Sequence, residues 1–125
     1  MILVIEGETP SKKNAKKFNT KTRCVYTNKH FQQWHTSAQL QVNVQATSLK
    51  EEYNFPINQP CRINLTFIHG DNVRRDSDNG TSSILDLLQD CGVLEDDNWK
   101  IVRELNIKND YLKGKPSCKV EIVLL

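Results

Sequence analysis

The sequence predicts an α+β protein of one domain, a βαβαββ chain whose mixed sheet packs against two helices. Its 125 residues, 38% of them hydrophobic, suffice for a single modest core. Several segments alternate apolar and polar residues as half-buried strands do, and two others repeat apolar residues near a helical period. Neither internal repeats nor low-complexity tracts divide the chain, so residues 1–125 are expected to form one domain.

The first part of the chain is expected to hold a strand, a basic loop and a helix. Residues 2–5 are typical of an opening strand, which ends before Pro10. Residues 11–22 show no apolar periodicity and predict a loop or a loose hairpin closed by RCVYT. A helix capped by Thr27 or Asn28 follows. Its apolar residues recur near a helical period at Phe31, Trp34, Ala38, Val42 and Leu49.

A second strand and a second helix are expected to follow. Residues 61–69 alternate cleanly, and their buried face is expected to hold Cys61, Ile63, Leu65 and Phe67. The helix is expected to start near Asn79, with Asp78 or Asn79 as its cap, and to run to Cys91. Gly92 then predicts a left-handed terminator.

Two more strands are expected at the C-terminus. Apolar and polar residues alternate at 99–108 and again at 118–124. The turn-like NDYLKGKPS between them predicts an antiparallel hairpin.

Composition excludes several classes of protein. No apolar run approaches the roughly 20 residues of a membrane-spanning helix, and MILVIEG lacks the features of a secretory signal. The four cysteines stand far apart, which excludes a CxxC zinc clamp. The lack of a secretory signal favours free, mostly buried thiols over two disulfides. We expect a soluble protein of the cytoplasm, with no membrane partner and no small-molecule cofactor.

The net charge of +2 averages two segregated regions. Residues 10–30 carry seven basic residues and no acid, whereas acids gather between residues 86 and 97. A basic arm beside an acidic pocket is typical of a protein that holds a polyanion by its phosphates and processes it at a metal. A solvated loop of ordinary charge is the alternative for the arm.

Two pairs of aspartates flank the second helix. Asp76 and Asp78 stand two apart before it, so both carboxylates project to one side if the segment is extended. Asp96 and Asp97 follow its other end, and the next hairpin is expected to carry them back toward the sheet. Such a cluster suits Mg²⁺, which takes oxygen ligands and leaves positions for phosphate oxygens. The alternatives are a capping role for Asp78 and Asn79 and a solvated turn for the later pair.

These motifs also carry a resemblance. RRDSDN at residues 74–79 and LLQDCGVLEDD at residues 87–97 resemble the RusA family of Holliday junction resolvases, whose signature is an RxDxDN segment, a helix, a glycine and two terminal aspartates. GETPSKKNAKK at residues 7–17 and VYTNKHFQQW at residues 25–34 resemble that family's N-terminal turn, basic loop and entry into its first long helix. The resemblance spans nearly the whole chain.

The resemblance implies a homodimeric endodeoxyribonuclease that depends on magnesium, with manganese as an alternative, and resolves four-way DNA junctions in recombination and repair. By position, it implies that Asp76, Asp78 and Asp97 are catalytic and bind the metal, with Asp96 beside them as a further metal ligand. Asn79 matches the motif's asparagine and is expected to support the site. The residues expected to bind DNA are Lys12, Lys13, Lys16, Lys17, Arg23, Arg74 and Arg75. Small resolvases of this kind are frequent in prophages, which fits a bacterial or phage-encoded protein.

Ser82 departs from the family's pattern, because a lysine usually stands four residues after the second aspartate. A serine at this supporting position supplies no positive charge to a transition state, so weakened turnover is expected. The lysines that are candidates to take that place are Lys12, Lys13, Lys16, Lys17 and Lys100. A junction-binding protein without cleavage is therefore the second hypothesis. A small interaction domain whose acids are only surface charge is the third.

Overall fold

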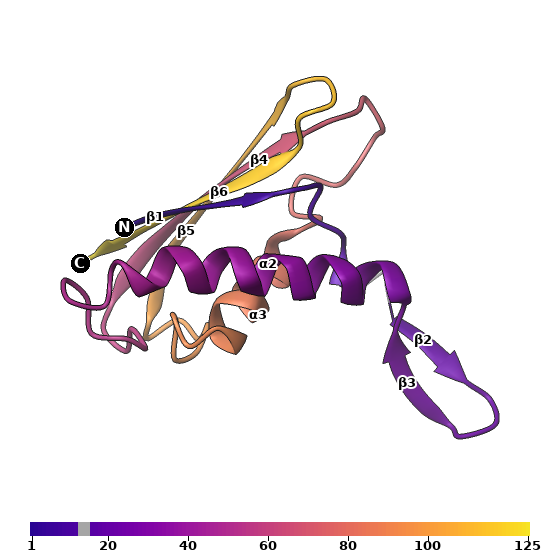
Figure 1. Cartoon of the computed structure of the whole chain (residues 1–125), viewed down its shortest axis with the longest axis horizontal. Helices are drawn as coiled ribbons and strands as arrows, with labels where there is room; N and C mark the ends of the chain where they lie inside the picture. The colour runs from indigo at the N-terminus through magenta and orange to yellow at the C-terminus, as the bar shows by residue number, and fades with distance from the viewer. Residues whose placement is uncertain (13–15) are drawn as a thin grey trace.

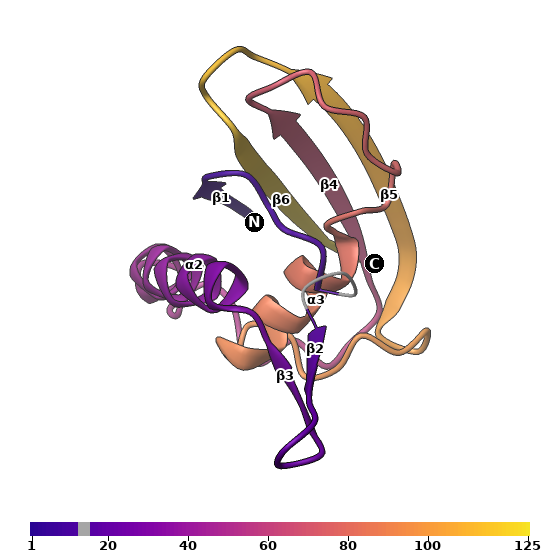
Figure 2. The same cartoon turned by 90° about the vertical axis from the view of Figure 1, so that its right-hand side faces the viewer.

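The computed structural model describes residues 1–12 and 16–125. The strands of its main sheet, in spatial order, are β1 (Ile2–Glu6), β6 (Ser117–Leu124), β4 (Cys61–His69) and β5 (Val102–Tyr111). β4 and β5 run parallel, and the other neighbours are antiparallel. Two helices, α2 (Lys29–Thr47) and α3 (Thr81–Asp90), lie on one side of this sheet (Figure 1, Figure 2). The predicted α+β architecture, a mixed sheet against two helices, is confirmed.

The basic stretch forms a hairpin, one of its two predicted alternatives. β2 (Lys16–Asn19) and β3 (Cys24–Thr27) pair antiparallel in a sheet of their own. In the turn, Asn19 Oδ1 accepts hydrogen bonds from Lys21 N and Thr22 N at 2.9 and 3.2 Å. The hairpin projects beyond the start of α2, away from the main sheet (Figure 1). It therefore carries basic residues outward from the body of the protein.

α2 begins where its sequence predicts. Asn28 Oδ1 accepts a hydrogen bond of 2.8 Å from Phe31 N, which satisfies one of the free N–H groups at the helix start. The buried face consists of Phe31, Trp34, Ala38, Val42 and Ala46. Leu49 lies beyond the helix and is partly buried. No helix among the described residues has both the length and the apolar character that crossing a membrane requires.

The core lies between the inner face of the sheet and the two helices. β4 buries all four residues predicted for its inner face, and β6 adds Cys118, Val120 and Ile122. α3 contributes Ile84, Leu85, Leu87 and Leu88. The predicted free thiols are confirmed: Cys61 and Cys118 are buried, Cys91 is half-buried and Cys24 is exposed.

The predicted hairpin between the last two strands is wrong, because β4 lies between β5 and β6 and pairs with both. Residues 112–116 cross the end of β4, where Leu112 N donates to His69 O at 3.0 Å and Gly114 N donates to Gly70 O at 2.9 Å. The same turn-forming residues that suit a tight hairpin also suit this crossing. The consequence is a strand β5 that starts at Val102 and runs parallel to β4.

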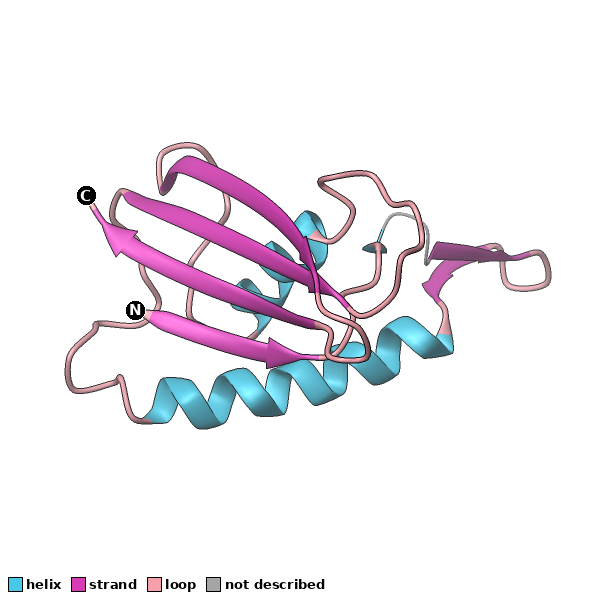
Figure 3. Cartoon of the chain, turned by 90° about the horizontal axis from the view of Figure 1, so that it is seen from above, coloured by secondary structure: helices cyan, strands magenta, loops and turns pink. Residues whose placement is uncertain are grey.

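The two edges of the sheet differ. Side chains of α2 close the β1 edge: Val4 N donates to Gln45 Oε1 at 2.8 Å, and Gln45 Nε2 donates to Val4 O at 2.7 Å. Glu6 N likewise donates to Gln41 Oε1 at 2.7 Å. Figure 3 shows β1 and β5 as the two margins of the sheet, with α2 beside β1. β5, on the other margin, is exposed at every residue after Val102.

Candidate functional site

Residues 70–80, termed the acid loop, join β4 to α3 and carry Asp76 and Asp78. The loop is irregular as far as Asp76 and then turns: Asn79 N donates to Asp76 O at 3.0 Å, and Thr81 N donates to Asp78 O at 3.1 Å. Asp78 thus lies in a turn, so the condition under which both carboxylates project to one side, an extended segment, is not met. Both side chains are exposed, and among the residues that the structure describes neither carboxylate has a hydrogen-bond or ion-pair partner. The loop therefore presents uncommitted carboxylate oxygens to solvent.

Gly80 fixes the end of the acid loop against the core. It is the N-cap of α3, with φ −100° and no side-chain capping bond. A Cβ at this position would lie 2.8 Å from Thr9 Cγ2 and 2.9 Å from Phe67 Cε1, so only glycine fits this close approach. The predicted cap by Asp78 or Asn79 is wrong, because α3 begins two residues later than expected, at Thr81. The predicted terminator at the other end is present, since Gly92 has φ 71°.

A polar network braces the start and the middle of the acid loop. His69 Nδ1 lies 2.8 Å from Glu8 Oε2, and His69 Nε2 lies 2.8 Å from Asn109 Oδ1. The carboxylate of Glu8 and the amide of Asn109 thus hold the ring from both of its nitrogens. Asn109 Nδ2 donates at 2.8 Å to Ser77 O, the carbonyl between the two aspartates. Contacts from three separate segments thus hold the backbone that carries the carboxylates.

Arg75 is engaged within the acid loop. Its guanidinium donates to both carboxylate oxygens of Asp71 at 2.7 and 3.1 Å, and it lies 3.6 Å from Glu8 Oε1. The hydrogen bond from Arg75 lowers the pKa of Asp71, and the same contact raises the pKa of Arg75. These contacts give Arg75 a bracing role in addition to the DNA contact expected from sequence. Arg74 is exposed beside it.

Asp96 and Asp97 lie next to the start of β5. Ile101 N and Val102 N both donate to Asn98 O, at 3.1 and 2.9 Å, which holds this turn against the strand. Asp96 accepts hydrogen bonds of 2.8 Å from Asn98 Nδ2 and from Asp97 N. These bonds, that of Asn98 foremost, lower the pKa of Asp96. Asp97 is exposed.

The two aspartate pairs are held at opposite ends of β5. Ser77 is tied to Asn109, whereas Asn98 is tied to Val102. These two anchors are seven residues apart on the strand (109 minus 102). At roughly 3.3 Å per residue, about 23 Å separates them.

The expected cluster of the two aspartate pairs therefore does not form within one chain. Within residues 1–12 and 16–125, no three His, Cys, Asp or Glu side chains group closely enough to hold a metal ion. The physical reason is the topology: β5 runs parallel to β4, so α3 and the turn after it return the chain to the far end of the sheet before β5 begins. The catalytic and metal-binding roles of Asp76, Asp78, Asp96 and Asp97 stay predictions.

Comparison with protein families gives one decisive match. The family model described as Endodeoxyribonuclease RusA covers residues 7–123 of the 125-residue chain. The chain belongs to the RusA family. Members of this family are endodeoxyribonucleases that resolve Holliday junctions and generally depend on a divalent metal ion. The comparison with curated proteins gave no match.

The basic arm of this RusA-family chain is fixed at its base to α3. Lys12 forms an ion pair with Asp86, and its backbone N donates to Ser83 Oγ at 3.0 Å. Ser83 Oγ donates in turn to Pro10 O at 2.6 Å. The ammonium group of Lys12, expected to bind DNA, is thus shared with a carboxylate.

Beyond its base, the arm offers an exposed surface. Arg23 lies in the hairpin turn with φ 56° and is exposed. Phe18 and Val25 of the hairpin are 58% and 65% exposed. Three residues expected to bind DNA cannot be placed in this way: Lys13 lies outside the described residues, and so do the side chains of Lys16 and Lys17.

Ser82, at the position where the RusA family usually has lysine, is exposed on the first turn of α3. Asp86 lies one helical turn further along the same side, and it binds Lys12. Among the candidate lysines, Lys12 is therefore placed one turn from Ser82. Lys100 lies in the turn beside Asn98, at the other end of β5.

Trp99 was expected on the apolar side of a strand, but it is 70% exposed in the turn before β5. Arg103 Cζ lies 5.6 Å from the centre of its ring. An exposed indole two residues after Asp97 is a surface on which a nucleobase can stack. The alternation of Trp99 and Ile101 with Lys100 suited a strand, so this exposure was missed from the sequence.

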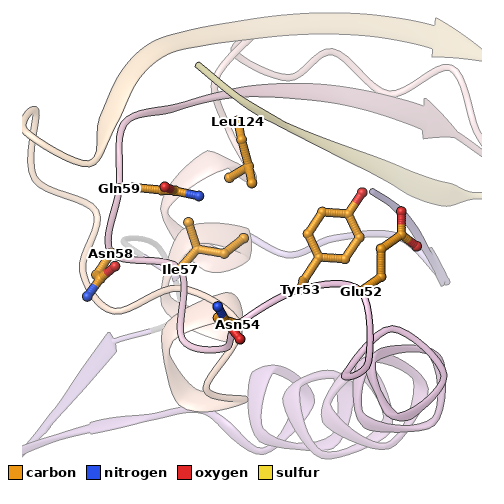
Figure 4. A pocket seen from close by; sticks show the side chains of 7 residues that line it. All are labelled: Glu52, Tyr53, Asn54, Ile57, Asn58, Gln59 and Leu124. Carbon is orange, nitrogen blue, oxygen red and sulfur yellow. The ribbon is translucent and has the colours of Figure 1, made fainter.

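A cavity of about 290 Å³ lies away from the acid loop, where β4 begins and β6 ends (Figure 4). Its lining consists of Glu52, Tyr53, Asn54, Ile57, Asn58, Gln59 and Leu124. One carboxylate among seven lining residues makes this cavity a poor cation site. The candidate site is therefore the exposed acid loop and not this cavity.

Proposed function

We propose that the chain is a magnesium-dependent endodeoxyribonuclease that resolves four-way DNA junctions in recombination and repair. The observation that carries the proposal is the acid loop, on which Asp76 and Asp78 are exposed and have no hydrogen-bond or ion-pair partner among the described residues. Their backbone is braced through Ser77. Like charges on one short loop cost stability unless a cation neutralises them. The family match supports action on DNA.

The donor set of the acid loop fits a magnesium ion. Mg²⁺ is commonly bound through one or two carboxylates, keeps several waters and takes phosphate oxygens of the substrate. Asp76 and Asp78 supply two hard oxygen donors, and manganese accepts the same kind of ligand. When bound, the ion orients a water and offsets negative charge on the phosphate. The braced backbone keeps both carboxylates in place for it.

We assign Asp97, with Asp96 beside it, to the site of a second copy of the chain. A separation of about 23 Å between the anchors of the two pairs excludes a shared ion in one chain. Groups at opposite ends of a strand meet when two copies lie in opposite directions about a two-fold axis. A homodimer of this kind has two such sites, which matches the approximate two-fold symmetry of a four-way junction.

The DNA backbone is proposed to contact the basic arm and the start of the acid loop. Arg23 and Arg74 are exposed and available to phosphates, together with the lysines of the arm. Lys12 and Arg75 contact the DNA only where a phosphate displaces their carboxylate partners, which are Asp86 for Lys12 and Asp71 for Arg75. Each neutralised phosphate releases counterions, so binding is expected to weaken steeply with salt.

A second candidate is a protein that binds junctions without cutting them. Ser82 supplies no charge at the position of the usual lysine, and Asp86 already holds the neighbouring ammonium of Lys12. On this proposal the acid loop binds a cation, but the transition state lacks a stabilising charge. In either case we propose that residues 1–125 act as one domain in the cytoplasm of a bacterium, as a host or prophage protein.

Cleavage of labelled DNA tests these proposals. Wild-type protein with Mg²⁺ is expected to make symmetrical nicks in a four-way junction but not in a linear duplex of the same sequence. Asp78→Asn is expected to abolish the nicks, whereas Glu51→Gln, which removes the same charge from an exposed turn, is expected to retain them. Binding without product in Mg²⁺ or Mn²⁺ favours the second candidate. Absence of both binding and cleavage refutes both candidates and leaves an interaction domain.

A further inference from the structure

Trp99 presents an indole to solvent in the turn that joins Asp97 to β5. The chain has two tryptophans, of which Trp34 is 8% exposed and Trp99 is 70% exposed. Figure 2 shows the turn that leads into β5 at the margin of the molecule, on the side away from α2. Single apolar side chains are common on protein surfaces, so exposure alone does not indicate a ligand. What distinguishes this indole is the turn that holds it, the cation on one of its faces and the charges beside it.

The turn restrains the backbone on both sides of Trp99. Lys100 N donates to Asn98 Oδ1 at 2.9 Å, and Ile101 N donates to Asn98 O at 3.1 Å. Ile101 is buried, and its carbonyl accepts a hydrogen bond of 2.8 Å from Cys61 N of β4. A residue that is held in place before binding loses less conformational freedom when a ligand covers it. The indole is therefore presented by a braced turn and not by a loose loop.

Arg103 occupies one face of the indole. Its Cζ lies 5.6 Å from the centre of the ring, which is the geometry of a cation–π contact. Among the residues that the structure describes, no second cation and no aromatic ring stacks on Trp99. The guanidinium thus restrains the ring from one side and leaves its other face open. That open face is a flat surface on which a nucleobase can stack.

Two cations without carboxylate partners flank the ring. Lys100 and Arg103 are both exposed, and neither forms an ion pair with a described residue. The neighbouring Glu104 is paired instead with Arg62, at 3.5 Å. An aromatic ring beside cations is the combination with which proteins bind unpaired nucleic acid, because the ring takes a base and the cations take its phosphates. These charges favour a nucleic acid over an apolar peptide as the occupant.

We propose that the open face of Trp99 stacks on a nucleobase at the branch point of a DNA junction, beside the phosphate that is cut. This inference rests on the proposed function, which assigns Asp97 to the metal site. Two residues of chain span at most about 7 Å, so a base on Trp99 belongs to a nucleotide close to the phosphate held at that site. Lys100 and Arg103 contact phosphates of the same strand.

The stacking makes Trp99 a residue that selects branched DNA. In a linear duplex each base is paired and stacked on both faces, so the indole finds no partner unless a base is first unstacked. Unstacking costs least where a base is already unpaired. A base at an open branch point lacks a stacking neighbour on one face, and the indole takes that place. The carboxylates act on a phosphate, which every strand carries, so the selection of a branch falls to a group that contacts the bases.

Binding to labelled DNA without divalent ions tests this inference, because no strand is cut. Trp99→Ala is expected to weaken binding to a four-way junction about tenfold or more, the usual loss when a stacked ring is removed. Its affinity for a linear duplex of the same sequence is expected to stay near that of the wild type. Trp99→Phe keeps a ring and is expected to bind the junction nearly as the wild type does. Leu40→Ala, which removes another exposed apolar side chain, from α2, is the control.

Salt separates the role of the ring from that of the cations. Lys100→Gln is expected to weaken binding to junction and duplex alike, and to reduce the slope of log K against log salt by about one. Trp99→Ala is expected to leave that slope unchanged, since a stacked base releases no counterion. A loss of junction affinity in Trp99→Ala that comes with a reduced slope would assign the effect to phosphate contacts and overturn the stacking.

Tryptophan fluorescence reports the contact directly. Trp34→Phe leaves Trp99 as the single tryptophan and breaks no hydrogen bond among the described residues, because Trp34 Nε1 has no partner there. Acrylamide is expected to quench the emission of this variant strongly in the free protein. The junction is expected to quench the emission and to shield the indole from acrylamide, whereas the linear duplex does neither. An indole that is already shielded in the free protein would identify a second protein copy as its occupant and overturn the inference.

The outcomes separate the stacking from the proposed function. Equal junction affinities for the wild type, Trp99→Ala and Trp99→Phe, or a Trp99 emission that the junction leaves unchanged, overturn the stacking and leave cleavage to its own assay. The expected results in binding and fluorescence, together with a chain that does not cut the junction in Mg²⁺, support the stacking and refute the nuclease.

Discussion

Asn109 Nδ2 donates a hydrogen bond of 2.8 Å to Ser77 O, and so joins β5 to the middle of the acid loop. Ser77 stands between Asp76 and Asp78, so this one contact restrains the backbone of both. Asn109 also holds His69 through its Oδ1. The position of the candidate metal site is therefore set by a strand distant in sequence and not by the loop alone.

Asn109→Ala is expected to lower the kcat of junction cleavage about tenfold or more, because loosely held carboxylates lose their orientation. The KM for the junction is expected to stay near that of the wild type. The lost hydrogen bonds are expected to lower the free energy of unfolding by only about 1 kcal/mol each. Steady-state kinetics and thermal melts measure these effects, with Asn43→Ala at an exposed position of α2 as the control. An unchanged kcat would exclude a positioning role for Asn109.

Asp71 is expected to make stability depend on pH at the acid end. Its pKa in the folded chain is lowered, chiefly by the hydrogen bond from Arg75. Its contribution to stability is therefore complete above the unfolded pKa of about 3.9 and is lost as pH falls through the lower folded pKa. Wild type is expected to melt above Asp71→Asn near neutral pH, and the difference in Tm is expected to shrink below about pH 4. A difference in Tm between the two proteins that stays constant down to acid pH would show that Asp71 does not cause this pH dependence.

Ser82→Lys is expected to raise the rate of junction cleavage about tenfold or more, because a positive charge near the acid loop stabilises the transition state. Asp86 holds Lys12, so Lys12 is not expected to supply that charge in the wild type. Ser82→Gln is the matched control, since it adds length without charge. Equal rates for the lysine and glutamine variants would show that charge at this position does not limit the reaction. Activity in the lysine variant alone would identify the wild type as a junction binder.

The thiols are expected to differ widely in their reaction with iodoacetamide. Burial raises the pKa of Cys118 to about 12, and burial together with Asp90 raises that of Cys91 to about 11. The thiolate is the reactive form, so at mildly alkaline pH both are expected to react slowly. Cys24 is exposed and is expected to be alkylated first, as mass spectrometry of peptides can follow. Rapid alkylation of Cys118 in the folded chain would contradict the packing of β6.

Structure could be predicted from the sequence where residues a few positions apart determine it. The Asn28 cap and the alternation of residues 61–69 act within a few residues, and both are found as predicted. The path of β5 could not be predicted in this way, because the connection at residues 112–116 suits a hairpin as well as a crossing over β4. That one long-range pairing moved Asp97 away from the acid loop.

The candidate site likewise combines residues that a local motif indicates with residues that only the long-range fold brings together. Asp76 and Asp78 stand out in the sequence because two carboxylates in a short motif already indicate cation binding. No sequence motif indicates that Glu8, His69 and Asn109 belong to the site. They become neighbours only through the parallel register of β4 and β5 and the return of the chain from β1, which no local pattern specifies.

Mixed dimers test whether Asp78 and Asp97 act in the same chain. If each site takes Asp78 from one copy and Asp97 from the other, neither Asp78→Asn nor Asp97→Asn alone leaves an intact site. A heterodimer of the two variants, in contrast, holds one site with both substitutions and one with neither. Mixing the two inactive proteins is then expected to restore cleavage.

The restored activity has a distinctive product. One intact site per dimer nicks one strand of the junction, whereas the wild type makes paired, symmetrical cuts, and a denaturing gel separates these products. Mixing Asp78→Asn with Asp76→Asn is the control, because both residues belong to one acid loop and every dimer then lacks a complete site. If Asp78 and Asp97 act within one chain, each copy in the heterodimer lacks one of them, so no activity returns. That result would refute the sharing of aspartates between two copies while leaving the role of the acid loop intact.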